Sequence, residues 1–154
     1  MTKNYLDIYN NLIKLTRNKK LYNKTRKDTF YDRLIILFFH LAFLLKEFKG
    51  VESKSNLQKF FDYSVRQIEL SIREIGYGDA TINKKMKEYV NLLFSIIDKI
   101  NEWENLNTHK KKEILKIYLE EVPNYDDYVI YFEKYSDFLS KNSFNSLSKD
   151  ILSL

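Results

Sequence analysis

The sequence predicts a single all-α domain, a bundle of about six to seven helices around one buried central helix. Only one of the 154 residues is proline and three are glycine, so strong helix breakers are rare. Apolar residues recur at helical spacing along most of the chain, without the sustained alternation that indicates strands. The third observation is the stretch Tyr31–Lys49, in which His40 is the one polar residue between Leu34 and Leu45. A helix that is apolar on all sides is typical of one that other helices surround.

The length of this central stretch separates a buried helix from a membrane span. Its twelve-residue apolar part would extend about 18 Å, which is short of a hydrocarbon core of about 30 Å. We therefore expect a buried helix, capped by Asp28 or Thr29 and stopped by Gly50. A second interpretation is that one face of this helix binds a partner.

The remaining helices follow from apolar spacing and from capping residues. A first helix is expected from Lys3 to Arg17, followed by a polar and basic loop. Ser55–Gln58 has the form of a capping box and predicts a helix that runs to Ile75. Gly76 and Gly78 can supply a tight reversal, after which Asp79 or Thr81 would cap a helix ending near Glu104.

The C-terminal third predicts three shorter helices. They are expected at Thr108–Glu121, closed by Pro123, then from Asn124 or Tyr125 to Lys141, and finally at Ser146–Leu154. Within one domain, we divide the chain into an N-terminal helix and basic loop at residues 1–28, a helical core at 29–142 and a short C-terminal helix at 143–154.

The charge is distributed unevenly. Residues 1–60 hold 13 Lys and Arg against 5 Asp and Glu, whereas the whole chain has a net charge of +5. The basic cluster suits an anionic partner such as ribosomal RNA or a membrane surface, or it is simply a solvated face. No base-reading motif accompanies it, so sequence-specific nucleic-acid binding is not expected. Its central members are Lys19, Lys20, Lys24, Arg26 and Lys27.

The residue types argue for a binding protein rather than an enzyme. Without cysteine there can be no disulfide, thiolate metal site or cysteine nucleophile. His40 and His109 have no companion ligands at metal-binding spacing, and we expect His40 to be buried and hydrogen-bonded. No cofactor or metal is therefore expected. The N-terminus lacks the apolar core of a signal peptide, which favours a cytoplasmic location.

Charged residues also form a ladder along one side of the helix expected before Gly76. Asp62, Arg66, Glu69 and Arg73 are spaced by four, three and four residues, which places opposite charges next to each other. The alternative to a binding surface is a solvated row of ion pairs.

Two stretches resemble the ubiquinol–cytochrome c reductase assembly chaperones of alphaproteobacteria and mitochondria. The first is YDR at 31–33 followed by LFFHL, and the second runs from Phe61 to Lys87 with REIGYGD and KKMK at its centre. The resemblance covers roughly residues 20–140. It departs from the family pattern at Ser71-Ile72 and at Phe94-Ser95. The matching positions are Asp32, Arg33, His40, Glu69, Arg73, Glu74, Gly76, Gly78, Asp79, Lys85, Met86 and Lys87.

This resemblance implies a non-catalytic, all-helical chaperone for newly made cytochrome b, peripheral to the inner membrane. A small helical partner protein and a position near the ribosome are further implications. The matching residues other than the two glycines are expected to contact the client or a partner. For the apolar contact we expect either the aromatic helix Tyr125–Phe138 or one side of the central helix.

Overall fold

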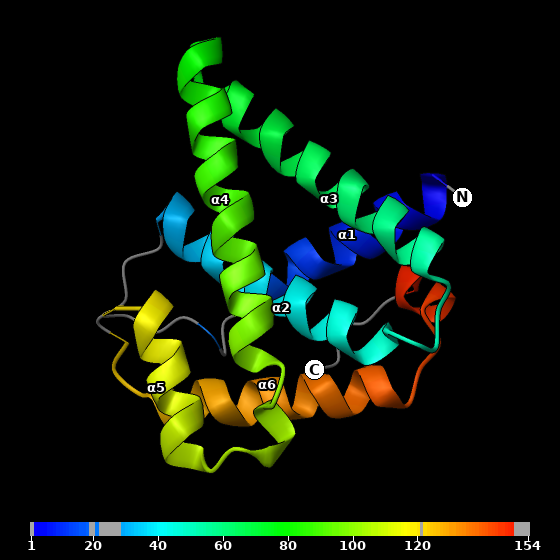
Figure 1. The fold of residues 1–154 in the computed structure, drawn as a ribbon, viewed down its shortest axis with the longest axis vertical. Coiled ribbons are helices and arrows are strands. Elements are labelled where there is room, and N and C mark those ends of the chain that lie inside the picture. The colour runs from blue at the N-terminus through cyan, green and yellow to red at the C-terminus, as the bar shows by residue number, and fades with distance from the viewer. Residues whose placement is uncertain (1, 19–20, 22–28, 121, 150–154) are drawn as a thin grey trace.

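The all-α prediction is confirmed (Figure 1). The computed structural model describes residues 2–18, 21, 29–120 and 122–149, and over these residues the chain forms six α-helices and two short 3-10 turns. The elements are α1 (Thr2–Thr16), α2 (Phe30–Phe48), α3 (Lys54–Ile75), α4 (Asp79–Ile100), η2 (Trp103–Asn105), α5 (Thr108–Tyr118), α6 (Tyr125–Ser140) and η3 (Asn145–Ser148).

Helix α2 is the buried centre that its sequence predicts. Every residue from Leu34 to Leu44 is buried, and α1, α4 and α6 pack around it. Thr29 caps the helix by accepting a hydrogen bond from the amide of Asp32 at 3.1 Å. Gly50 follows the helix with a φ of 86°, a conformation that favours glycine. Since no side of residues 34–44 is exposed, this part of the helix has no free face for a partner, and partner binding by the helix stays a prediction for its less buried ends.

Helices α3 and α4 form a hairpin that projects from the rest of the molecule (Figure 1). The predicted start at Ser55 is wrong by two residues. Ser53 has an extended backbone and its hydroxyl accepts from the amide of Asn56 at 3.0 Å, so Ser55 already lies in the first turn.

The reversal between these helices uses its two glycines differently. Gly76 has a φ of 102° and ends α3, whereas Gly78 has a φ of −72° that any residue can adopt. Helix α4 begins directly at Asp79, so neither Asp79 nor Thr81 is its cap. Arg73 instead uses the Asp79 carboxylate as a hydrogen-bond acceptor.

Two later helix boundaries differ from the prediction, because the 3-10 turns η2 and η3 occupy positions where α-helix was expected. Helix α4 stops at Ile100, and the 3-10 turn η2 buries Trp103 against Phe43, with ring centroids 5.2 Å apart. At the C-terminus the expected helix is a 3-10 turn, η3, that packs on α1. Residues 150–154 of that prediction lie outside the described residues.

Candidate functional site

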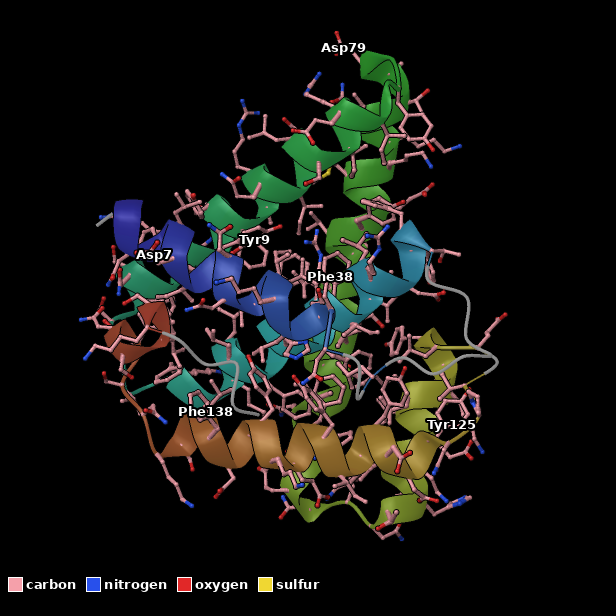
Figure 2. All side chains as sticks on the ribbon, turned by 180° about the vertical axis from the view of Figure 1, so that it is seen from behind. Asp7, Tyr9, Phe38, Asp79, Tyr125 and Phe138 are labelled. Atoms are coloured by element: carbon pink, nitrogen blue, oxygen red, sulfur yellow. The ribbon has the colours of Figure 1, made fainter. Side chains whose placement is uncertain are left out.

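The later part of the second resembling stretch forms the outer end of the α3–α4 hairpin, which we call the hairpin tip (residues 69–87). Arg73 links its two helices by donating to Asp79 Oδ1 at 2.8 Å and to Glu69 Oε2 at 3.5 Å. Lys85 places its Nζ 4.8 Å from the centre of the Tyr77 ring. Asp79 lies at the end of the molecule farthest from α6, which carries Tyr125 and Phe138 (Figure 2). The tip is therefore a charged and exposed end with one defined ion-pair network.

Two of the matching residues at the tip serve the fold. Gly76 makes the reversal, and Met86 is buried against the core. Glu74 and Lys87 are exposed. The predicted charge ladder holds from Arg66 onward, because Arg66 Nη1 lies 2.5 Å from Glu69 Oε2. Asp62 instead accepts a hydrogen bond from Gln58 at 2.9 Å.

The first resembling stretch lies apart from the tip, on the buried helix. Asp32 and Arg33 are half-buried in the first turn of α2. Arg33 lines a cavity of about 130 Å³ between α1, α2 and α3, together with Ile68 and Ser71 of α3. The structure thus does not bring all the matching residues into one site.

His40 is a buried part of the core, as its sequence context predicts. Its Nδ1 lies 2.8 Å from the Ile36 carbonyl oxygen, which can only accept, so Nδ1 carries the proton. Nε2 then accepts from the Tyr131 hydroxyl at 2.7 Å. Burial lowers the pKa of His40 from 6.5 to about 4, so the ring is neutral at pH 7. None of the His40 surface is exposed, so its side chain cannot contact another protein in this conformation.

One apolar surface of the described residues is a groove that the sequence did not reveal. This α3–α4 groove has a volume of about 510 Å³ and opens where the two helices diverge above the end of α2. The Phe61 and Phe94 rings stack across it with centroids 5.5 Å apart and an interplanar angle of 19°. Phe94 is 52% exposed. The groove is lined by Leu45, Lys49, Gly50, Glu52, Lys54, Leu57, Gln58, Phe61, Phe94 and Ile97.

The expected apolar surface on the aromatic helix is wrong. In α6 the side chains of Tyr128, Tyr131, Phe132 and Tyr135 are all buried. Tyr135 donates to the His40 carbonyl oxygen at 2.8 Å. The aromatic residues of this helix hold it against α2 and leave no aromatic face for a client.

Three further sequence predictions concern the basic cluster, metal binding and membrane crossing. Lys19, Lys20, Lys24, Arg26 and Lys27 lie outside the described residues. Among the described residues, no group of His, Asp and Glu side chains has the arrangement of a metal site. Within the same ranges, every helix is too short or too polar to cross a membrane.

The comparisons with known proteins identify the family. A model of the ubiquinol-cytochrome C chaperone family matches residues 26–105, which is more than half of the chain. The chain belongs to this family. The matched segment contains α2, α3 and α4, and therefore both the hairpin tip and every residue that lines the α3–α4 groove.

A solved structure has the same fold. The crystal structure of the Cbp3 homolog from Brucella abortus superposes with a TM-score of 0.77 at 22% sequence identity, covering 96% of this chain and 86% of that one. No curated protein sequence matches the chain. Membership of this chaperone family supports a role in assembling ubiquinol–cytochrome c reductase.

Proposed function

We propose that this chaperone holds newly made cytochrome b during the assembly of ubiquinol–cytochrome c reductase, and that the α3–α4 groove is its apolar contact. The observation that carries the proposal is the stacking of the half-buried Phe61 ring on the exposed Phe94 ring, inside the segment that the family model matches. An unfinished membrane protein exposes apolar surface that water disfavours. A groove with apolar walls and a charged surround is the kind of surface that covers it.

The hairpin tip is a separate charged surface on the same hairpin, and its nearest member on α3, Glu69, lies about 12 Å along the helix from Phe61. We assign a steering role to the exposed or half-exposed tip side chains that the family pattern shares, because charges at the edge of an interface steer and orient a partner more than they add affinity. These residues are Glu69, Arg73, Glu74, Asp79, Lys85 and Lys87.

Replacing Phe94 by Asp is expected to reduce the capture of cytochrome b by about tenfold or more. Full burial of a Phe side chain contributes about 1.5–3 kcal/mol, and a carboxylate in its place would have to be desolvated on binding. The measurement is affinity purification of the tagged chain in mild detergent, with cytochrome b quantified by mass spectrometry at low and high salt.

The matched control for this variant is Ile117→Asp. Ile117 is 57% exposed on α5 and lies outside the family-matched segment, so it should leave capture unchanged. Equal capture by the wild type and Phe94→Asp, with both folded by circular dichroism, would refute the groove as the client contact.

Reversing the charge of Arg73 is expected to lower the rate of client capture several-fold while leaving the fold intact. Arg73 is an exposed ion-pair residue, and such pairs contribute at most about 1 kcal/mol to stability. In Arg73→Glu the new carboxylate faces Glu69 and Asp79, so the tip becomes uniformly acidic there. Arg66→Glu is the control, since Arg66 pairs with the same Glu69 but lies below the tip. Equal losses in both variants would mean that general charge, and not the tip, governs capture.

A further inference from the structure

The α3–α4 groove is polarised along its length. At the end of α2 the lining changes from Leu45 to Lys49, the capping residue that follows the last helical residue. On α3 the order is reversed along the chain. The lining begins with Lys54 and continues with the apolar residues Leu57 and Phe61, at steps of three and four. Both helices therefore present a lysine at the end beside Gly50 and apolar side chains farther in.

Lys49 and Lys54 supply the positive charge at this end of the groove. In the part of the chain that the structure describes, neither Lys49 nor Lys54 has an ion-pair partner within 4.0 Å. Glu52 is the acidic residue among the lining side chains, and its carboxylate accepts a hydrogen bond from Asn56 Nδ2 at 3.0 Å. The lining side chains thus carry one net positive charge, located at the mouth.

The size of the groove favours a small ligand over a whole helix. Its volume of about 510 Å³ falls in the range of about 300–1,000 Å³ that is usual for small-molecule sites. One turn of a helix with side chains, about 10–12 Å wide and 5.4 Å long, occupies roughly the same volume. A helical segment would therefore insert about one turn, whereas a single hydrocarbon chain could fit entirely.

We propose that the α3–α4 groove binds an anionic amphiphile. The hydrocarbon chain lies against Leu57, Phe61, Phe94 and Ile97, and a phosphate or carboxylate head group lies between Lys49 and Lys54. The ligand occupies the surface that we assign to the client, but its binding to the isolated chain needs no client and goes beyond that function. For a membrane-protein chaperone, such a ligand would compete with the client where anionic lipid is abundant.

The test is titration of the purified, isotope-labelled full chain with lysophosphatidylglycerol and with lysophosphatidylcholine, both below their micelle concentrations, followed by nuclear magnetic resonance. The backbone amide of Gly50 at the groove mouth is expected to shift, and those of Gly76 and Gly78 at the hairpin tip are not. Lysophosphatidylglycerol should bind about fivefold more tightly, as expected for two exposed ion pairs.

Variants of the protein test the contact with the head group and the contact with the hydrocarbon chain separately. The double variant Lys49→Gln/Lys54→Gln should bind both lipids equally and with the affinity that the wild type has for lysophosphatidylcholine. Phe94→Asp should weaken both. The control Lys110→Gln/Lys134→Gln removes two exposed lysines from α5 and α6 and should change neither.

Three results would overturn the proposal. One is equal affinity of the wild type for both lipids, and another is a set of shifts that leaves Gly50 unaffected. The third is binding by an acidic, apolar helical peptide at Gly50 without binding by either lipid, which would assign the groove to a protein segment. None of these three results decides the proposed client function, because Phe94-dependent capture of cytochrome b is measured without added lipid.

Discussion

Acidification from pH 7 to pH 4.5 is expected to destabilise the wild-type protein by about 2 kcal/mol more than a His40→Gln variant. Burial lowers the folded-state pKa of His40 from 6.5 to about 4. Between these values the unfolded chain binds a proton that the folded chain does not, so stability falls as the pH falls. The loss is complete below pH 4 and reaches about 3 kcal/mol in total.

The measurement is urea unfolding at several pH values, followed by circular dichroism. Glutamine does not titrate in this range and keeps a donor and an acceptor for the Ile36 carbonyl and the Tyr131 hydroxyl. The carboxylates titrate in both proteins, so the difference between the two pH profiles isolates His40. Parallel profiles would show that the ring is already accessible to protons in the folded state.

The buried centre could be predicted because its cause is local. A run of residues that is apolar on every side has no stable position except inside a helical bundle, and Thr29 and Gly50 set its limits by capping chemistry. His40 could likewise be placed in the core. Its partner Tyr131 could not be identified, since it lies 91 residues away in the sequence.

The groove could not be predicted, because its walls come from three helices and the angle between them decides what is covered. Leu57, Phe61 and Ile97 occur at the same helical spacing as core residues. In the structure they line the α3–α4 groove instead, where the Phe61 ring stacks on Phe94. The sequence analysis noted Phe94 only as part of the Phe94-Ser95 pair, in which the aromatic residue fits the family pattern and Ser95 replaces a glycine, and this gave no sign of a groove.

For the aromatic helix α6, the sequence predicted a binding surface where the structure has core residues. Six aromatic residues between Tyr125 and Phe138 look excessive for one helix in a small core, which suggested a binding face. The structure buries four of them because α2 offers apolar surface on all sides, and a helix packed there needs large side chains to reach it. An unusual density of aromatics thus marked a core contact, that of α6 with α2.

That contact leads to the largest expected effect on stability, which is the loss of the Phe132 ring. Phe132 is fully buried, and its ring centroid lies 5.5 Å from that of Phe39, 5.4 Å from that of Phe43 and 5.2 Å from that of His40. Phe132→Ala would leave a cavity at the junction of α2 and α6, with an expected cost of about 3–5 kcal/mol. For a chain of this length that corresponds to a fall in Tm of about 10 °C.

The control is Ile130→Ala, two residues away on the same helix, where the side chain is 52% exposed and the cost should stay within about 0.5 kcal/mol. Differential scanning calorimetry and urea unfolding measure both variants. If Phe132→Ala also loses client capture only in proportion to its unfolded fraction, the aromatic helix stabilises the fold and has no part in binding. A cost near that of Ile130→Ala would instead mean that α6 can move inward to close the cavity, and that its packing on α2 is looser than the ring geometry indicates.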